Sequence, residues 1–326
     1  MFAAGAVWRS GKCSIMLQLQ RISAATPQGS RASCRYLLTS PRHLLRCIAR
    51  MEPGAPFRVD TRRHTLVHQA MAATFTATLI HDDPGYARQA VAAAWAELDR
   101  LEGLLSRFVE SSDISRINAL GPGQSTAVHG DTVACLGVAL AVHGWTGGAF
   151  DVAYGSCGPW SPRPRFELDN APPAVRVLEP GVRLDLGGIG KGFALDRMAA
   201  ILADWDVEAS LLAASTSTLL GTGSPAGNEG WPVVLGPERK PQRVFLKDRA
   251  LSGSGVSVRG GHIVDPRTGR HVARPLRAWA AAPSAAMADA LSTAFMVMSQ
   301  TEVREFCRRH PTVAAWRQET PEDVAS

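Results

Sequence analysis

Hydrophobic and polar residues alternate along residues 74–80 (Thr-Phe-Thr-Ala-Thr-Leu-Ile), a pattern typical of a half-buried strand. An Asp-Asp-Pro turn follows, and apolar residues then recur every three or four positions, which predicts an amphipathic helix over 85–106. The apolar positions of this helix are Ala94, Leu98, Leu101 and Leu105. A second helix is expected from an N-cap at Asp131 to the region of Gly144.

The rest of the chain mixes short strands with further helices. Helices are expected over 191–205 and 287–299, and short β-like runs cover 183–186, 211–214, 231–235 and 244–246. No regular βαβ repeat is present, so the pattern favours an α+β fold with mixed, largely antiparallel sheets flanked by helices. The Pro-rich stretch from Pro159 to Pro173 is interpreted as a surface excursion that divides two intimately packed lobes.

The net charge of +6 is concentrated at the N-terminus. Residues 1–50 carry eight basic residues and no acidic one, so the rest of the chain holds 27 basic against 29 acidic residues. We interpret 1–50 as a basic disordered leader or a misassigned N-terminal extension, 60–310 as the folded domain and 311–326 as a C-terminal tail. The nearly neutral body argues against nucleic-acid binding.

Targeting and membrane signals are weak. The apolar stretch 2–8 precedes the first basic residue, Arg9, and Arg46 stands where a lipoprotein signal needs a small residue before Cys47. No Cys-x-x-Cys pair and no run of eighteen apolar residues occurs, which argues against a zinc site and an integral membrane segment. We expect a cytoplasmic location, with a periplasmic one as the alternative if the N-terminus is misassigned.

A glycine-rich turn, Asp185-Leu-Gly-Gly-Ile-Gly-Lys-Gly192, is the first candidate for chemistry. Four glycines and a lysine at a predicted strand-to-helix turn suit an anion, because backbone amides can approach it closely and Lys191 adds a charge. A Walker loop is excluded, since Asp185 replaces its first glycine and Gly192 its metal-binding Ser or Thr. The alternative is a tight structural turn.

Asp289 and Thr293 form the second candidate, within an Ala-rich segment. Their spacing of four places a carboxylate and a hydroxyl on one helix face, with Ser292 beside them, and hard cations such as Mg²⁺ prefer such oxygen ligands. In the alternative interpretation Asp289 is exposed and Thr293 bonds back to its own helix. An acidic residue in so apolar a segment favours a functional role for Asp289 over the structural alternative.

The third candidate is Gly261-His-Ile-Val-Asp-Pro-Arg-Thr-Gly269. His262 can accept a proton near neutral pH, and Arg267 can bind a phosphate or carboxylate in a bidentate manner. The alternative is a Pro-Arg-Thr-Gly turn in which Asp265 bonds to its own backbone and His262 lies at the surface.

These segments occur in a fixed order with others that are less chemical by themselves: Met71-Ala-Ala-Thr74, Ser106-Arg-Phe108, Ser112 to Asn118, and Gly147-Gly-Ala-Phe-Asp151. In that order they resemble the ApbE family of flavin transferases. The most specific matches are to the family motifs Asp-Leu-Gly-Gly-Ile-Ala-Lys-Gly, His-Ile-Ile-Asp-Pro-Arg-Thr-Gly and Asp-Ala-Leu-Ser-Thr. The resemblance extends from about Leu66 to Met298 and implies an ApbE-like fold.

The resemblance implies a Mg²⁺-dependent FAD:protein FMN transferase. Such an enzyme cleaves FAD, attaches FMN to a threonine of an acceptor flavoprotein, and releases AMP. FAD would be bound by Met71, Phe108, Ala149, Phe150, Asp151, Asp185, Lys191 and Ile263. Magnesium would be bound by Asp289, Ser292, Thr293 and the carbonyl of Gly188. Lys191 would neutralise charge on the transferred group, and His262 would be the base for the attacking hydroxyl, with Asp265 as the next candidate.

The chain departs from the family pattern in one turn. Ala214-Ser215-Thr216 stands where the family has Gly-Gly-Asp or Gly-Gly-Asn, and Ala72 replaces the glycine of the opening motif. Side chains at these positions narrow the space through which the backbone approaches a ligand. The altered turn therefore leaves open a flavin-binding protein without turnover. A second alternative is an FAD pyrophosphatase, in which water replaces the acceptor hydroxyl and FMN and AMP are formed.

Overall fold

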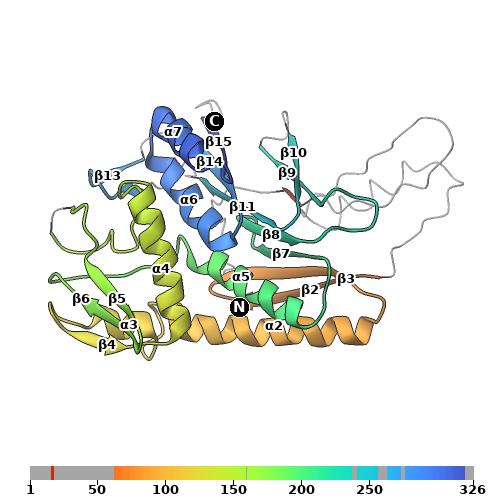
Figure 1. The fold of residues 1–326 in the computed structure, drawn as a ribbon, viewed down its shortest axis with the longest axis horizontal. Coiled ribbons are helices and arrows are strands. Elements are labelled where there is room, and N and C mark those ends of the chain that lie inside the picture. The colour runs from red at the N-terminus through yellow and green to blue at the C-terminus, as the bar shows by residue number, and fades with distance from the viewer. Residues whose placement is uncertain are drawn as a thin grey trace, which may run out of the picture.

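One antiparallel sheet of seven strands organises the chain. The computed structural model describes residues 16–17, 62–158, 160–236, 241–255, 263–272 and 276–319. Within them the strands follow the order β15-β14-β11-β8-β7-β3-β2 (Figure 1). Their bounds are β2 (Arg63–Ala70), β3 (Ala73–Ile80), β7 (Ser210–Ala214), β8 (Thr218–Thr222), β11 (Arg249–Gly255), β14 (Leu276–Ala282) and β15 (Ala314–Glu319).

The two faces of this sheet bury different partners, because successive side chains along a strand point to opposite faces. On one face, residues such as Leu212 of β7 and Leu220 of β8 join the main core with three helices, α2 (Pro84–Leu105), α5 (Gly190–Asp204) and α6 (Ala285–Val297). On the other face, Leu211 and Leu219 pack against Trp231 and Val233 of a strand pair, β9 (Trp231–Leu235) and β10 (Gln242–Leu246).

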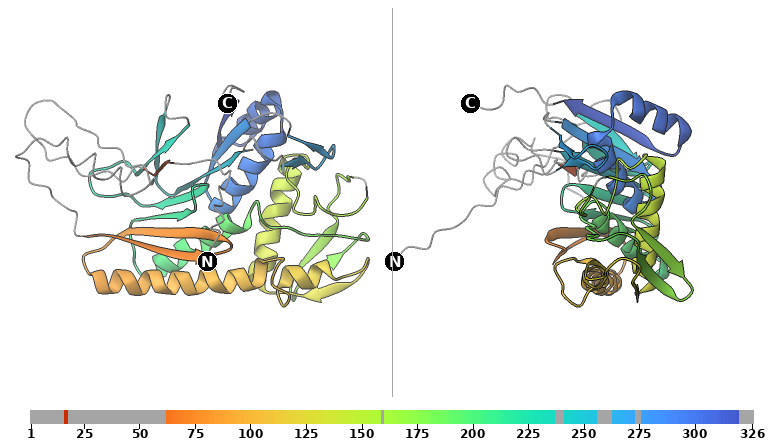
Figure 2. Two further views of the ribbon diagram at one scale, coloured as in Figure 1. Left: turned by 180° about the vertical axis from the view of Figure 1, so that it is seen from behind. Right: turned by 90° about the vertical axis from the view of Figure 1, so that its left-hand side faces the viewer.

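The middle of the chain forms a second, smaller lobe beside the sheet (Figure 2). It contains α3 (Asp113–Asn118), α4 (Gly130–Trp145) and a three-stranded sheet of β4 (Ser125–Ala127), β6 (Pro173–Val177) and β5 (Phe166–Asn170). This lobe lies between β3 and β7 in the sequence. The two strands nevertheless pair directly in the large sheet, where Phe75 is the partner of Ala214. The remaining elements are β1 (Met16–Leu17), which pairs with β9, the pair β12 (Val264–Asp265) and β13 (Arg270–His271), and α7 (Gln300–Arg309).

The α+β class with largely antiparallel sheets is confirmed, as are most of the predicted elements. The predicted strand 74–80 is β3, and the predicted helix 85–106 is α2, whose N-cap Asp83 accepts from the amides of Gly85 and Tyr86. The helices expected over 191–205 and 287–299 are α5 and α6. Every helix among the described residues is too short or too polar to cross a membrane.

The strand predicted over 183–186 is wrong. These residues pair with no strand among the described residues, because the end of α3 and the loop after α4 accept hydrogen bonds from the amides of residues 183–185 instead. The amide of Arg183 donates to Ser156 Oγ (2.9 Å), that of Leu184 to Asn118 Oδ1 (2.6 Å) and that of Asp185 to the Val152 carbonyl (2.8 Å). The chain therefore reaches the glycine-rich turn as an irregular segment.

Three smaller expectations also need correction. The N-cap of α4 is His129, whose Nδ1 accepts from the amide of Asp131, so Asp131 lies in the first turn. The Pro-rich stretch interpreted as a surface excursion contains β5, because Phe166 is buried and pairs with Val177. The predicted tail from residue 311 includes β15, which adds to the edge of β14.

Candidate functional site

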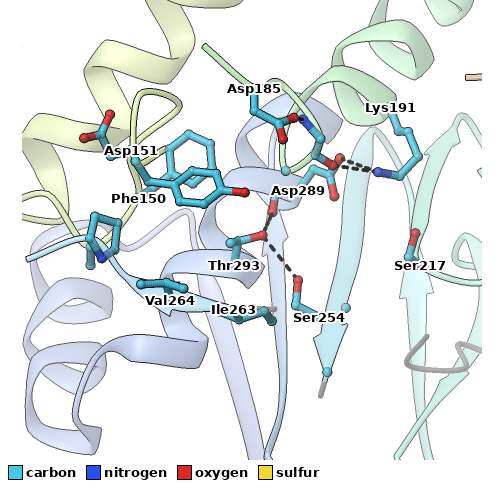
Figure 3. Close-up of a pocket in the computed structure, with 17 residues that line it drawn as sticks. Phe150, Asp151, Asp185, Lys191, Ser217, Ser254, Ile263, Val264, Asp289 and Thr293 are labelled. Carbon is cyan, nitrogen blue, oxygen red and sulfur yellow. Dashed lines mark hydrogen bonds and ion pairs between the residues drawn. The ribbon is translucent and has the colours of Figure 1, made fainter. Parts of the chain in front are cut away.

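A cavity of about 350 Å³ lies where the loops of the small lobe meet α5, α6 and the end of β11 (Figure 3). Nine of the residues predicted from the sequence line it, although they come from distant parts of the chain. They are Ala149, Phe150, Asp151, Asp185, Gly188, Lys191, Ile263, Asp289 and Thr293. The glycine-rich turn and the Asp289 helix face are thus parts of one site.

Asp289 is buried in α6 and ties this helix to α5. The N-cap residue of α5, Ile189, provides no side-chain hydrogen bond, and Asp289 Oδ2 accepts from the amide of Gly192 at 3.2 Å instead. In return Asp196 of α5 binds the first amides of α6, with Oδ1 accepting from Ala285 (2.7 Å) and Oδ2 from Ala286 (2.8 Å). A negative charge near a helix N-terminus is favourable, so each helix stabilises the start of the other.

Burial opposes the charge on Asp196. It raises the pKa of this carboxyl to about 6, against the lowering by the Ala286 and Ala285 amides. Asp196 does not line the cavity, so we assign it a structural role in the α5–α6 pair.

Lys191 extends along the cavity wall towards Asp289. Its Nζ donates to the Gly187 carbonyl at 2.9 Å and lies 3.9 Å from Asp289 Oδ2 (Figure 3). Gly188 lies against both Thr293 and Phe150. A Cβ on Gly188 would come within 3.3 Å of Thr293 Oγ1 and 3.2 Å of the Phe150 ring. The glycine therefore lets the turn approach α6 closely.

Asp185 stabilises the glycine-rich turn and holds a neighbouring arginine. Its Oδ1 accepts from the amide of Gly187 at 2.9 Å, and its Oδ2 lies 3.1 Å from Arg107 Nε. The Arg107 guanidinium in turn lies 4.3 Å from the centre of the Phe108 ring. Phe108 is 82% exposed and does not line the cavity, and neither does Met71, which packs against the main core.

The loop that carries Phe150 and Asp151 is fixed by buried groups. His143 of α4 lies with Nδ1 3.2 Å from the Phe150 carbonyl, the amide of Phe150 donates to Thr146 Oγ1 at 3.2 Å, and Asp151 Oδ1 accepts from the amide of Ala153. These contacts hold the loop that forms this wall of the cavity.

The Asp-Pro-Arg-Thr-Gly turn is structural at Asp265. Its carboxylate accepts hydrogen bonds from Nε and Nη2 of Arg267, each at 3.0 Å. It also accepts one from the backbone amide of Arg267. Arg267 also donates to Glu302 of α7 at 2.7 Å. Asp265 is thus already neutralised and is a poor second candidate for the base. The first candidate, His262, lies outside the described residues.

The four predicted metal ligands separate into two groups. Asp289, Thr293 and Gly188 line the cavity, whereas Ser292 is fully buried behind it and donates to the Asp289 carbonyl at 2.9 Å. Ser254 of β11 lines the cavity instead and lies 2.8 Å from Ser292 Oγ and 3.4 Å from Thr293 Oγ1. Among the described residues no group of three or more His, Cys, Asp or Glu side chains is placed to hold a metal ion, so this site offers a cation oxygen donors of mixed type.

Sequence reasoning missed Ser217, Ser254 and Tyr154, all of which line the cavity. Ser254 stands in a Ser-Gly-Ser-Gly run whose small residues were a usable signal, but Tyr154 carried none. Tyr154 is 48% exposed and lines two further cavities, of about 320 Å³ towards Trp160 and about 600 Å³ towards Arg107 and Arg183. Its side chain therefore marks the junction of all three.

Strained turns lie at the end of the sheet next to the site. Met71 and Ala72, in the two-residue turn between β2 and β3, have φ of 49° and 52°, and Ser215, between β7 and β8, has φ of 52°. The amide of Ser215 donates to the Thr74 carbonyl, so the two turns are adjacent. This left-handed region favours glycine and is costly for other residues. Two of the departures from the family's glycines, Ala72 and Ser215, thus keep a backbone conformation that favours glycine, whereas Ala214 is an ordinary residue of β7.

We expect Ser215→Gly to raise the free energy of unfolding by about 0.5–1 kcal/mol, because relief of the strain exceeds the added chain entropy. Thr216→Gly is the control, since Thr216 is exposed and its φ is not positive. That control is expected to lose about 0.5–1 kcal/mol. Urea unfolding of both variants measures the difference, and equal losses in the two would contradict the strain.

Comparison with known proteins adds to this geometry. The profile of the ApbE family matches residues 71–316. An FAD:protein FMN transferase of Salmonella typhimurium is 25% identical over 256 residues, which cover 65% of this chain and 72% of that protein. One of Klebsiella pneumoniae is 21% identical over 302 residues, covering 80% and 85%.

The fold has a solved counterpart. The apo structure of the Pseudomonas stutzeri flavinyl transferase ApbE matches with a TM-score of 0.70 at 21% identity, covering 80% of this chain and 92% of that one. This similarity confirms the ApbE-like fold expected from the sequence.

Proposed function

The chain belongs to the ApbE family, and we propose on this basis that it is an FAD:protein FMN transferase, which uses Mg²⁺, attaches FMN to a threonine of an acceptor flavoprotein and releases AMP. The observation that carries this proposal is that Lys191, Asp289 and Thr293 project into one and the same cavity beside the glycine-rich turn. The names of the two relatives support the same activity.

The donors around Asp289 fit a hard cation. A carboxylate, the Thr293 and Ser254 hydroxyls and the Gly188 carbonyl are all oxygen ligands of the kind that Mg²⁺ binds. Of the residues that the structure describes, no cysteine lines the cavity to favour a softer metal. Asp289 supplies the negative charge of this set. When bound, Mg²⁺ would neutralise charge on the pyrophosphate oxygens.

The protein's own part in the reaction is mainly alignment and charge, as phosphoryl transfer requires. Lys191 adds a positive charge at the cavity wall, 3.9 Å from Asp289. The Phe150–Asp151 loop, held by His143 and Thr146, forms another part of the wall. We propose His262 as the base that removes the proton of the acceptor threonine, a role that stays a prediction because this residue lies outside the described part of the chain.

FAD needs more room than the central cavity alone provides. The volume of the central cavity, about 350 Å³, lies near the lower end of the roughly 300–1,000 Å³ that is usual for ligand sites. Because the three cavities share Tyr154, we propose that the dinucleotide extends past this side chain into a neighbouring cavity. Burial raises the pKa of the Tyr154 hydroxyl above its ordinary value, which already keeps this group protonated at neutral pH.

We therefore expect Tyr154→Ala to weaken FAD binding about tenfold, because contacts with an aromatic ring are each worth about 0.5–1.5 kcal/mol beyond the area they bury. Titration of flavin fluorescence measures this change. Tyr154→Phe, which keeps the ring, is the control and should bind nearly as well as the wild type. Wild-type affinity in the alanine variant would show that FAD does not pass this junction.

Product analysis tests the proposed activity against its two alternatives. The protein is incubated with FAD and Mg²⁺, with and without co-expressed candidate flavoproteins, and FAD, FMN and AMP are separated by chromatography. The transferase requires AMP release that depends on the acceptor, and flavin fluorescence that stays with the denatured acceptor in a gel. A pyrophosphatase gives free FMN and AMP without acceptor. A protein that retains FAD and releases no AMP is a binding protein only.

A further inference from the structure

Two buried hydroxyls lie directly behind Asp289 on the sheet side. Thr218 of β8 and Ser252 of β11 are both fully buried, and they are partners across the β8–β11 ladder. Their hydroxyl oxygens lie 2.9 Å apart, and each lies 3.2 Å from Asp289 Oδ1. Neither residue lines the cavity, although their chain neighbours Ser217 and Gly253 do.

The proton count shows what these hydroxyls do. Each carries one proton, so when one donates to Asp289 Oδ1, the other can donate to its neighbour's oxygen or also to Oδ1. Ser292 Oγ, 3.3 Å from Ser252 Oγ, extends the same network. Among the acceptors of the described chain that lie within reach of the Thr218 and Ser252 hydroxyls, Asp289 Oδ1 is the only charged oxygen, so we expect at least one of them to donate to it.

The other carboxylate oxygen has a different environment. Oδ2 accepts from the amide of Gly192 at 3.2 Å and lies 3.9 Å from Lys191 Nζ, which lines the cavity. With Oδ1 fixed on one side, the rotation of the carboxylate about its terminal bond, which is otherwise soft, is restricted. Oδ2 is left on the Lys191 side, where a cation would be bound.

We propose that Thr218 and Ser252 are positioning residues, which hold the Asp289 carboxylate through Oδ1 so that Oδ2 is presented to a divalent cation. This inference rests on the proposed function for the identity of the cation. Thr218 is the first residue of β8 and lies two residues after the altered turn at 214–216. Groups that orient metal ligands in this way typically contribute 10–100-fold to metal affinity or activity, so we expect about tenfold here.

The test measures metal binding without FAD. Mn²⁺ is titrated into the full chain, and free Mn²⁺ is followed by electron paramagnetic resonance. We expect Thr218→Val and Ser252→Ala each to weaken Mn²⁺ binding about tenfold. Thr218→Ser, which keeps the hydroxyl, should restore this binding. In all three variants the affinity for FAD without metal should change less than about twofold. At saturating Mg²⁺ the rate of AMP release should return to near the wild-type value, which a general loss of structure would not allow.

Thr222→Val is the matched control. Thr222 lies on the same strand, and its hydroxyl pairs with Ser210 Oγ at 2.8 Å, away from Asp289. The inference would be overturned if Ser252→Ala and Thr218→Val kept the wild-type Mn²⁺ affinity, or if Thr222→Val lost as much affinity as they do. A wild type that binds no Mn²⁺ would overturn it as well. If Thr218→Val does not fold, Ser252→Ala, which removes one oxygen, decides alone. Weakened Mn²⁺ binding in a protein that never cleaves FAD would leave the inference standing and refute the proposed function.

Discussion

Replacing Asp289 with asparagine is expected to lower Mg²⁺-dependent release of AMP from FAD by about 10³-fold or more, because this loses the negative charge of the proposed metal site, which is worth several kcal/mol of charge stabilisation. Asp289 is buried, and its two oxygens receive donors from β8, β11 and α5. The asparagine fills the same space, so the fold should persist. Single-turnover rates at several Mg²⁺ concentrations measure the loss.

Asp196→Asn is the appropriate control for this experiment. Asp196 is a second carboxylate in the same helix pair and is half-buried, but it binds the first amides of α6 and does not line the cavity. We expect this variant to lose stability by about 1 kcal/mol, as when a helix cap is removed, while its Mg²⁺ dependence stays close to that of the wild type. Wild-type activity of Asp289→Asn at limiting Mg²⁺ would exclude Asp289 as a metal ligand.

The second large effect is expected for Gly192→Ala, which should destabilise the protein by about 3 kcal/mol. A Cβ at this position would lie 2.2 Å from the Ala285 carbonyl oxygen, 2.5 Å from its carbon and 2.8 Å from the amide nitrogen of Ala286. All three are backbone atoms, so α5 and α6 would have to separate. The same movement would break the hydrogen bond from the Gly192 amide to Asp289.

Thermal unfolding measures this effect, and a fall in Tm of roughly 5–10 °C corresponds to that loss for a domain of this size. Gly103→Ala is the control, since Gly103 lies in α2 with no atom within 4 Å of its added Cβ. Alanine should stabilise that helix by up to about 1 kcal/mol. A Gly192→Ala protein with wild-type Tm and wild-type Mg²⁺ dependence would mean that the α5–α6 contact adjusts without cost.

The local periodicity of the sequence predicted the helices well and the irregular parts poorly. The helices α2, α5 and α6 carry their own apolar spacing, so their existence followed from the sequence alone. Residues 183–186 have the same β-like composition as true strands. Their amides are taken by Ser156, Asn118 and Val152, which lie far away or in loops, and no local pattern encodes that choice.

For the site, the family motifs predicted most of the residues but not their arrangement. Lys191 and Asp289 are 98 positions apart and meet because Gly192 allows α5 to contact the start of α6. Ser292 was predicted as a metal ligand from its neighbours in the helix, yet helical rotation turns it towards β11 and away from the cavity. Thr218 and Ser252 are recognised only once the register of β8 and β11 is known.

The pairing of Phe75 with Ala214 has a consequence for how the protein assembles. The hairpins β2–β3 and β7–β8 each join residues that are close in the sequence, so they can form early. Joining β3 to β7 has to enclose the whole small lobe, and such a long loop costs entropy before any distant contact forms, which makes the step slow. The turn at Ser215 and the strand that carries Thr218 are positioned by this joining, so we expect competence to bind a cation at Asp289 to appear only in the last kinetic phase of refolding.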